Sequence, residues 1–277
     1  MLTRTFCHIP GIGLERERRL WAAGICCWDD AGGSELPLTP ALERAIRAEA
    51  RRSTQRLARR DARYFARHLP SHQQWRLFDQ FRDSAAFLDI ETTGLGGPDD
   101  YVTAIALYDG QRVRHYVCGE NLDQFETDVA QYDLLVTYNG KSFDVPFIGK
   151  FMNVRLDQAH VDLMYVLRSL GYTGGLKAIE RRLGYERSDM ADIDGFFAVV
   201  LWHEYQRTDD RRVLETLLAY NVQDVLNLEP LMAFAFNRKL EATPFTRELH
   251  LPEPTTHTNP FRVHREVVDR LKRQSSW

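Results

Sequence analysis

The chain has 277 residues, of which 44% are hydrophobic and 27% charged, a composition typical of a globular protein with a buried core. Lys and Arg total 36 against 39 Asp and Glu, which gives a net charge of −3. No apolar run approaches the length of a membrane span, and the N-terminus lacks the apolar stretch of a signal peptide. We therefore expect a cytoplasmic protein with no membrane partner.

Charge is divided unevenly along the chain. Residues 1–84 contain 15 Arg, no Lys and 10 acidic residues, whereas residues 85–277 contain 21 basic and 29 acidic residues. The first segment therefore carries a net charge of +5 and the second a net charge of −8. An asymmetry of this kind indicates a polyanionic partner. The four cysteines form no CxxC pair, and we interpret them as reduced structural thiols.

The first third of the chain is predicted to be helical. A glycine turn at Gly11 and Gly13 leads into the first helix. Residues 41–69 form one long predicted helix, with Thr39 as its cap and Pro40 in its first turn. Its arginines recur mostly at spacings of three, four or seven, so they crowd one broad side of the helix. They are Arg44, Arg47, Arg51, Arg52, Arg56, Arg59, Arg60, Arg63 and Arg67.

From residue 85 the apolar pattern changes to short buried runs. The segments predicted as strands are AAFLDI, VTAIALYDG, RVRHYVCG, DLLVTYNG and the start of HVDL. Helices are predicted over residues 121–131, 145–152, 176–183, 196–205 and 211–236. A meander of strands followed by alternating helix and strand indicates an α/β fold with a mixed sheet.

Two acidic residues end the first of these strands, in the segment LDIETTGLGG. Asp89 and Glu91 are two positions apart, so the alternation along a strand places both carboxylates on one side. Gly94, Gly96 and Gly97 then let the backbone turn and let a ligand approach closely. The alternative is a strand followed by an acidic turn without function.

A second polar turn, YNGKSFDVPF, follows the buried run DLLVTY. Asp144 falls where the next helix begins, and a carboxylate there can cap the helix or face a metal beside the first strand. Asn139 and Lys141 are candidates to hold phosphate or sugar groups, and Phe143 is a candidate to stack on a base or to pack in the core. Asp162, in HVDL, is predicted to cap the helix that follows it rather than to bind metal.

The third segment, AYNVQDVLNLEPL, lies within the longest predicted helix after residue 85. Tyr220 and Asp224 are four positions apart and therefore share one face of this helix. An aspartate among apolar residues is costly to bury unless it is paired or bound to a cation. The segment therefore predicts a carboxylate that faces a partner charge.

These three segments follow the order D-x-E-T, N-G-x-x-F-D and Y-x-x-x-D, which resembles the motifs of the DEDDy branch of the DnaQ-like 3′–5′ exonucleases. That family has a ribonuclease-H-like fold. Other segments resemble the bacterial YprB-like group within it, namely WRLFDQF, HVDL, GGLKAIERRLG and DGFFAVVLWHEYQ. The resemblance covers residues 71–236.

The resemblance implies a mechanism in which two divalent cations, Mg²⁺ or Mn²⁺, stabilise the attacking and leaving oxygens of a phosphodiester. The implied metal ligands are Asp89, Glu91, Asp144 and Asp224. Tyr220 is implied to orient the attacking water. Glu91 and the backbone of Thr92 and Thr93 are implied to meet the terminal 3′-hydroxyl, and Leu95 to wedge against the last base.

The segment IPGIGLERERRLWAAGI resembles the second half of a helix–hairpin–helix DNA-binding element. Its glycine turn exposes backbone N–H groups at a helix N-terminus, where phosphate is favoured. A hairpin that only packs against other helices is the alternative. On the arginine-rich helix we predict phosphate contacts rather than a solvated face, because its arginines far outnumber its acidic residues. The predicted contacts are Gly11, Gly13, Arg52, Arg56, Arg59 and Arg63.

The sequence therefore predicts a basic helical module over residues 1–70 and a ribonuclease-H-like exonuclease domain over residues 71–239. Residues 240–277 are predicted as a tail with a short basic helix, either a strap across the domain or a flexible arm. The predicted activity is 3′–5′ hydrolysis of single-stranded DNA ends to 5′-mononucleotides in DNA repair or processing, with a helicase as a candidate partner. Two alternatives stay open: a 3′–5′ exoribonuclease, or a weakly catalytic nucleic-acid-binding accessory of a helicase or repair complex.

Overall fold

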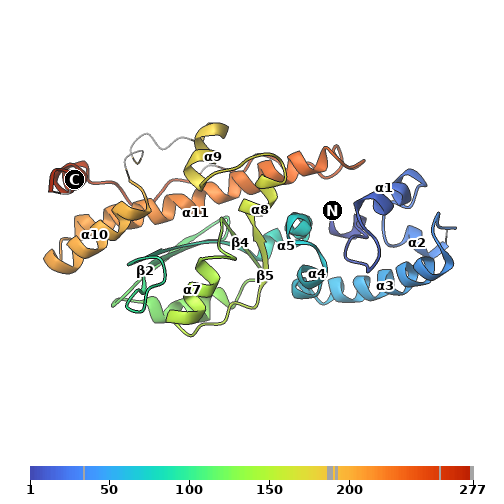
Figure 1. The fold of residues 1–277 in the computed structure, drawn as a ribbon, viewed down its shortest axis with the longest axis horizontal. Helices are drawn as coiled ribbons and strands as arrows, with labels where there is room; N and C mark the ends of the chain where they lie inside the picture. Colours follow the sequence, from blue (N-terminus) through green and yellow to red (C-terminus); the bar gives the residue numbers. More distant parts are fainter. Residues whose placement is uncertain (34, 186–189, 191–192, 256, 275–277) are drawn as a thin grey trace.

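The computed structural model describes residues 1–33, 35–185, 190, 193–255 and 257–274. At its centre is a five-stranded sheet in the order β3-β2-β1-β4-β5 (Figure 1). The strands are β1 (Ala85–Thr92), β2 (Val102–Tyr108), β3 (Val113–Val117), β4 (Leu134–Thr137) and β5 (Ala159–Asp162). β1 pairs antiparallel with β2 and parallel with β4. The predicted α/β fold with a mixed sheet is confirmed.

Helices cover the sheet and build the N-terminal part of the chain (Figure 1). The α-helices are α1 (Leu14–Ala22), α2 (Asp30–Gly33), α3 (Pro40–Ala58), α4 (Ala62–His68), α5 (Phe78–Phe81), α6 (Phe125–Val129), α7 (Asp144–Phe151), α8 (Leu163–Arg168), α9 (Leu176–Leu183), α10 (Gly195–Thr208), α11 (Arg211–Leu240) and α12 (Arg265–Gln274). Short 3₁₀ helices are η1 (Leu2–Arg4), η2 (Ser71–Leu77), η3 (Arg82–Ser84) and η4 (Leu122–Gln124). No helix within the described ranges is long and apolar enough to cross a membrane.

Side chains of β1 alternate between the two faces of the sheet. Phe87 packs in one core with apolar residues of α11, and Leu88 packs in another core with apolar residues of α7. Asp89 and Glu91 follow Phe87 at two-residue steps, so they share the face that α11 covers. This alternation aims both carboxylates at one helix.

The long helix predicted over residues 41–69 is wrong in one respect, because the structure divides it into α3 and α4. Arg60, between the two helices, has a φ of 52°, which a continuing right-handed helix does not allow. Asp61 begins the second helix, since its carboxylate accepts a hydrogen bond of 3.0 Å from the Tyr64 backbone N–H. The resulting bend lets Phe65 pack in the core.

One hydrophobic core joins the N-terminal helices to the sheet. Phe65 of α4 belongs to the same buried cluster as Phe87 of β1. Arg76 and Glu17 form an ion pair of 2.9 Å across this junction, with side chains only 2% and 0% exposed. The predicted division at residue 70 stays a prediction, and a continuous core crosses it.

After α11 the tail turns back along the same helix. Asn237 Nδ2 donates a hydrogen bond to the Leu251 carbonyl at 2.9 Å, and Asn237 Oδ1 accepts one from the Leu251 backbone N–H at 2.9 Å. Further along the tail, Asn259 Nδ2 donates to the carbonyl of Ala219 at 2.7 Å. Of the two predicted alternatives, the tail is therefore a strap.

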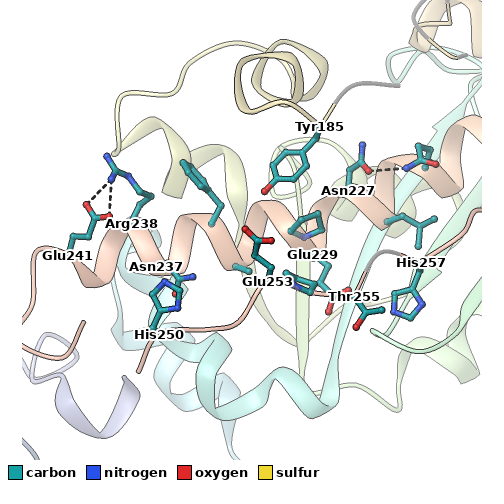
Figure 2. Close-up of a pocket in the computed structure, with 16 residues that line it drawn as sticks. Tyr185, Asn227, Glu229, Asn237, Arg238, Glu241, His250, Glu253, Thr255 and His257 are labelled. Atoms are coloured by element: carbon teal, nitrogen blue, oxygen red, sulfur yellow. Dashed lines mark hydrogen bonds and ion pairs between the residues drawn. The ribbon is translucent and has the colours of Figure 1, made fainter. Parts of the chain in front are cut away.

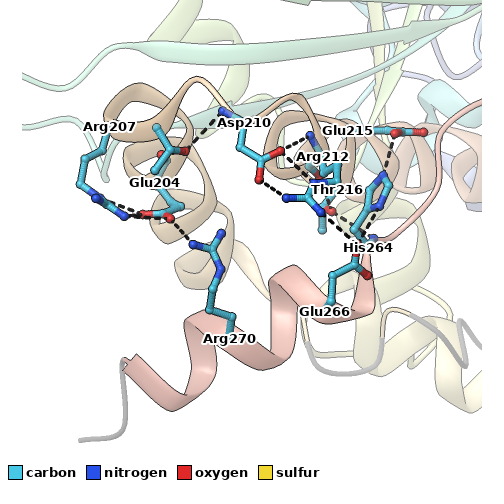
Figure 3. Close-up of polar contacts among 10 residues, drawn as sticks. Glu204, Arg207, Asp210, Arg212, Glu215, Thr216, His264, Glu266 and Arg270 are labelled. Atoms are coloured by element: carbon cyan, nitrogen blue, oxygen red, sulfur yellow. Dashed lines mark hydrogen bonds and ion pairs between the residues drawn. The ribbon is translucent and has the colours of Figure 1, made fainter.

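The described chain ends in α12, which packs on α10 and α11 (Figure 3). Arg270 Nη1 donates to Glu204 Oε1 on α10 at 2.8 Å. His264, just before α12, lies 2.7 Å from Glu215 Oε2 on α11. These polar contacts fasten the end of the strap to two helices at once.

A cavity of about 440 Å³ lies between α11 and the strap (Figure 2). Its wall is partly apolar, with Tyr185, Pro230 and Phe234 along it. At one end Arg238 is paired with Glu241 at 2.8 Å. This cavity shares no lining residue with the acidic cavity described next.

Candidate functional site

Three carboxylates converge at the carboxyl end of β1. Asp89 and Glu91 come from β1, and Asp224 comes from the face of α11 that covers it. One oxygen atom of each lies within 4.8 Å of the others. Glu91 and Asp224 are buried, and Asp89 is partly exposed. The sheet and the helix thus concentrate negative charge at one point.

Asp144 and Tyr220 complete the set of predicted catalytic residues. Both line the same cavity of about 510 Å³ as the three carboxylates. Asp144 is buried at the N-terminus of α7, outside the group of three whose oxygens approach within 4.8 Å. The fold therefore brings all five residues to one cavity, with three of the four carboxylates in mutual ligand range.

Burial and mutual repulsion disfavour the charged forms of these carboxylates. Burial raises the pKa of Asp89 well above its usual value, and the charges of Asp224 and Asp144 raise it further. Burial likewise raises the pKa of Glu91, with a further rise from Asp224. Burial raises the pKa of Asp144 to about 7, against the opposing effect of nearby backbone hydrogen bonds. In the absence of a cation, the cluster therefore retains protons near neutral pH.

This donor set fits a hard divalent cation. Carboxylate oxygens are the ligands that Mg²⁺ and Mn²⁺ prefer in proteins. Repulsion among the carboxylates is the cost of assembling the group, and a bound cation relieves it. Asn221 Nδ2 also donates to Asp89 Oδ2 at 2.7 Å, which orients one of the ligand atoms.

Lys177 of α9 lies against Tyr220. Its Nζ is 4.1 Å from the centroid of the Tyr220 ring, and it donates a hydrogen bond to the carbonyl of Ile193. The ammonium also lowers the pKa of Glu91, in opposition to burial. Lys177 therefore balances part of the negative charge and covers one side of the tyrosine ring.

Five of the six substrate contacts that were predicted near the carboxylates line the acidic cavity. They are Thr92, Thr93, Leu95, Asn139 and Phe143. Leu95 is 93% exposed, which is unusual for a large apolar side chain. Asn139 has a φ of 65°, in the left-handed region that asparagine tolerates.

The side chain of Lys141 is engaged elsewhere. Its Nζ donates to Gln74 Oε1 of η2, and burial lowers the pKa of this ammonium. Gln74 in turn donates to the carbonyl of Ala66 in α4 at 2.7 Å. Lys141 thus ties the loop after β4 to the N-terminal helices.

Asp162 caps α8 as predicted, because its Oδ1 accepts from the Met164 backbone N–H at 3.0 Å. The same carboxylate accepts from the backbone N–H groups of Asn139 at 2.9 Å and Lys141 at 3.0 Å. It therefore also holds the loop that leads to Asp144, a role that the sequence did not indicate.

Sequence reasoning missed one wall of the cavity. Phe196 and Val199 of α10 line it, and so does Tyr138. Phe196 is 76% exposed, and Phe197 beside it is buried. Adjacent residues on a helix point about 100° apart, and here Phe197 faces the core while Phe196 faces the cavity. The Phe-Phe doublet was at most a weak signal for an exposed aromatic residue.

The glycine turn predicted to contact phosphate precedes α1. Gly11 has a φ of 85°, and Gly13 is the N-cap residue of the helix. Both glycines are exposed. Among the described residues before this turn, the one helical element is η1.

Arginines of the predicted phosphate-contact surface partly pair with acids of the protein itself. The pairs are Arg52–Glu49 at 3.6 Å, Arg56–Asp61 at 2.9 Å and Arg63–Asp157 at 3.8 Å. Arg59 is exposed and forms no ion pair with the residues that the structure describes. Acids of the same segment, together with the more distant Asp157, therefore neutralise part of the charge counted on this surface.

One end of this arginine-rich surface lies far from the carboxylates. Arg60 Nη2 donates to Ser84 Oγ at 2.7 Å, directly before β1 begins. Glu91 lies near the other end of β1, and a strand rises by about 3.3 Å per residue, so the separation is about 20 Å. A nucleic acid that contacts both the Arg60 end of this surface and the carboxylates must therefore extend along the length of the sheet.

Comparisons with protein families and with curated proteins each find a match to this chain. Residues 86–235 match the model of the RNase_H superfamily. The Bacillus subtilis (strain 168) protein YprB, described as uncharacterized, is 25% identical over 217 residues. The match covers 69% of this chain and 51% of YprB. The chain thus spans about half the length of this curated relative.

Solved structures with similar chains include nucleases and a polymerase. The family B DNA polymerase of Pyrobaculum calidifontis is 20% identical, with a TM-score of 0.44, over 61% of this chain and 27% of the polymerase. Brucella melitensis NrnC with bound Mg²⁺ is 20% identical, with a TM-score of 0.40, over 59% of this chain and 77% of NrnC. The Aedes aegypti Nibbler EXO domain is 12% identical, with a TM-score of 0.40, over 58% of this chain and 80% of that domain.

Proposed function

The chain belongs to the RNase_H superfamily, and on this premise we propose that it is a metal-dependent 3′–5′ exonuclease of the DEDDy type. The observation that carries the proposal is the convergence of Asp89, Glu91 and Asp224 within 4.8 Å, in a cavity that Asp144 and Tyr220 also line. The proposed substrate is the 3′ end of single-stranded DNA, and the proposed products are 5′-mononucleotides.

The four carboxylates would hold two divalent cations, Mg²⁺ or Mn²⁺. When bound, such cations acidify a water molecule and stabilise negative charge on the attacking and leaving oxygens of the phosphodiester. The raised pKa values of Asp89, Glu91 and Asp144 support this assignment, because groups that resist ionisation alone gain most from a cation.

Side chains around the carboxylates are proposed to bind and orient the substrate. The Tyr220 hydroxyl would orient the attacking water, with Lys177 against its ring. Glu91 and the backbone of Thr92 and Thr93 would contact the terminal 3′-hydroxyl. Leu95 and Phe196 support a base-binding role, since both are large, exposed apolar side chains beside one cavity.

The N-terminal module is proposed to contact phosphates upstream of the 3′ end. Gly11 and Gly13 offer backbone N–H groups at the start of α1, and Arg59 offers an exposed guanidinium. Because part of this surface lies about 20 Å from the carboxylates along β1, it would hold nucleotides well behind the cleaved one.

The test is a nuclease assay on the full chain with Mg²⁺ or Mn²⁺. The substrates are 5′-labelled single-stranded DNA, duplex DNA and RNA of one sequence. We expect a ladder that shortens from the 3′ end of single-stranded DNA and is lost in Asp224→Asn. Asp209→Asn is the matched control, because Asp209 is exposed and its φ of 52° suits asparagine.

Other outcomes separate the alternatives. Faster shortening of RNA than of DNA would assign an exoribonuclease. Tight binding of DNA with no shortening by the wild-type protein would contradict the proposed activity and favour a binding accessory.

A further inference from the structure

The loop that follows β1 holds an apolar side chain out into solvent. Of the described residues, the two most exposed large hydrophobic side chains are Leu95 and Phe196, and both line the acidic cavity. Phe196 stands on a helix, which fixes its direction. Leu95 stands on the turn between Thr93 and Tyr101, which lies between β1 and β2. Something other than regular secondary structure must fix the direction of Leu95.

Asp100 ties this turn together from within. Its Oδ2 accepts hydrogen bonds from the backbone N–H groups of Gly96 at 2.9 Å and Gly97 at 2.6 Å. Its Oδ1 lies 3.4 Å from Thr93 Oγ1, which donates to it. One carboxylate therefore closes the turn on both sides of Leu95.

The turn is also braced against two walls of the cavity. Lys150 of α7, the helix that begins at Asp144, donates to the Gly96 carbonyl at 3.2 Å. Tyr101 OH accepts from Trp202 Nε1 of α10, the helix that carries Phe196, at 3.0 Å. The turn thus has one contact at its base, at Tyr101, and one beside Leu95, at Gly96. Asp100 connects the two ends through its hydrogen bonds to Thr93, Gly96 and Gly97.

Gly94 leaves no room for a side chain beside Asp100. A Cβ atom built on Gly94 would lie 2.5 Å from Asp100 Oδ1 and 2.7 Å from its carboxyl carbon. Real Cβ contacts are never this short, so a side chain at residue 94 would displace the carboxylate. The sequence of the turn is therefore matched to the position of Asp100.

From these contacts we propose that Asp100 is a positioning residue that pre-organises the turn so that Leu95 meets the terminal base of the substrate strand. The inference rests on the proposed exonuclease function. A side chain held in its working position before the substrate arrives avoids an ordering cost on binding, so the benefit falls on substrate affinity. Asp100 itself does not take part in the cleavage step.

The test compares steady-state kinetics of three variants on single-stranded DNA. Asp100→Ala removes both acceptor oxygens, and we expect KM to rise about five-fold with kcat within about two-fold of wild type, since the three hydrogen bonds that order the turn are lost. Asp100→Asn keeps an amide oxygen that can accept from Gly96 and Gly97, and we expect it to restore most of the affinity. Asp99→Ala removes the same charge from the exposed neighbouring acid and should leave KM unchanged.

Each outcome decides for or against the proposal. Wild-type KM in Asp100→Ala would overturn it. An equal rise in KM in Asp100→Asn and Asp100→Ala would also overturn it, because that result would assign the effect to charge rather than to hydrogen bonding. An inactive wild-type protein would instead contradict the proposed function, so the two failures are distinguishable.

Gly94→Ala provides a second variant that keeps Asp100 in place. The added methyl group displaces the carboxylate, so we expect a rise in KM similar to that of Asp100→Ala. In the double variant the collision is gone, and KM should not exceed that of Asp100→Ala alone. If the effects of the two substitutions on KM were instead additive in free energy, Gly94 would act independently of Asp100, and the proposed role of Asp100 would be overturned. Thermal melting of each variant verifies that it is folded.

Discussion

Asn221 of α11 donates a hydrogen bond of 2.7 Å from its Nδ2 to Asp89 Oδ2 of β1. Asn221 is fully buried and lies between Tyr220 and the helical turn that carries Asp224. It is a neutral donor among carboxylates, and it lowers the pKa of Asp89 against the effects of burial and of the neighbouring charges. The contact therefore joins the helix to the strand at the point where a cation would bind.

Replacing this donor tests its role in metal binding. Asn221→Leu keeps the branched shape of the side chain, although it is larger, and removes the hydrogen bond, so Asp89 loses its orientation. Loss of a group that orients a metal ligand costs about 10- to 100-fold in metal affinity or activity. We expect Mg²⁺ to stabilise the variant only at correspondingly higher concentrations, as measured by thermal melting in a Mg²⁺ titration.

Asn227→Leu is the matched control for this variant. Asn227 lies on the same helix and donates to Glu180 Oε1 at 2.9 Å, away from the acidic cavity. Its replacement should leave the Mg²⁺ midpoint unchanged. Equal shifts in both variants would mean that the effect comes from loss of helix packing.

Stability of the metal-free protein is expected to fall as pH rises through neutrality. The pKa values of Asp89 and Glu91 are well above their usual values, and that of Asp144 rises from 3.8 to about 7. Between the unfolded and folded pKa values, the folded protein binds protons that the unfolded chain has released. The free energy of unfolding therefore decreases with pH in this range, from about pH 5 to about pH 8.

Thermal melting in a chelator across this pH range measures the effect. Excess Mg²⁺ should abolish the decline, because the cation replaces the bound protons. Asp224→Asn should weaken the decline, since it removes one repelling charge, whereas Asp209→Asn should leave it intact. A melting temperature that rises steadily to pH 8 in chelator would contradict the expectation.

The buried pair of Arg76 and Glu17 makes the N-terminal helices and the sheet depend on each other. Glu17 also accepts from Thr5 Oγ1 at 2.5 Å and from the Phe6 backbone N–H at 2.8 Å. Arg76→Met leaves a buried carboxylate without its cation, which costs about 3–5 kcal/mol in the free energy of unfolding. Adding Glu17→Gln should recover part of this loss, because an amide can be buried without a counter-charge.

Urea unfolding followed by tryptophan fluorescence and circular dichroism measures both variants. One coincident transition is expected in the wild type, because one core joins the two parts. Two separate transitions would show that residues 1–70 unfold on their own. The Arg76–Glu17 pair would then contribute little to the coupling between these residues and the sheet.

The exposed arginines of α3 and of its C-cap position, Arg59, are expected to govern the salt dependence of DNA binding. Neutralising Arg44, Arg51 and Arg59 to Gln should reduce the slope of log affinity against log salt by about one to two, since each phosphate contact to a single strand contributes about 0.7. Fluorescence anisotropy of labelled single-stranded DNA with Asp224→Asn in the background measures affinity without cleavage.

A control with equal charge removes three exposed arginines elsewhere in the chain, namely Arg112, Arg238 and Arg247. This variant should keep the wild-type slope. Identical slopes in the two triple variants would assign the effect to net charge and would argue against a phosphate-binding surface on α3.

Local spacing accounts for what could be predicted of the site. Alternation along a strand placed Asp89 and Glu91 on one side, and the helical repeat placed Tyr220 and Asp224 on one face. Both rules depend only on backbone geometry within one element. The break between α3 and α4 also has a local cause. Asp61 is a typical helix-capping residue, but the helix-forming residues around it favour one continuous helix in a prediction from sequence.

By itself, then, the sequence determined the strands, most of the helices, the mixed α/β class and the side of each element that carries the acids. Only the tertiary structure decided that Asp224 comes within 4.8 Å of Asp89 and Glu91, while Asp144 stays outside that group. It also decided that Lys141 turns to Gln74 and that Phe196 enters the cavity wall. The physical reason is that these distances depend on how separate elements pack, and packing is set by many contacts between residues far apart in the chain.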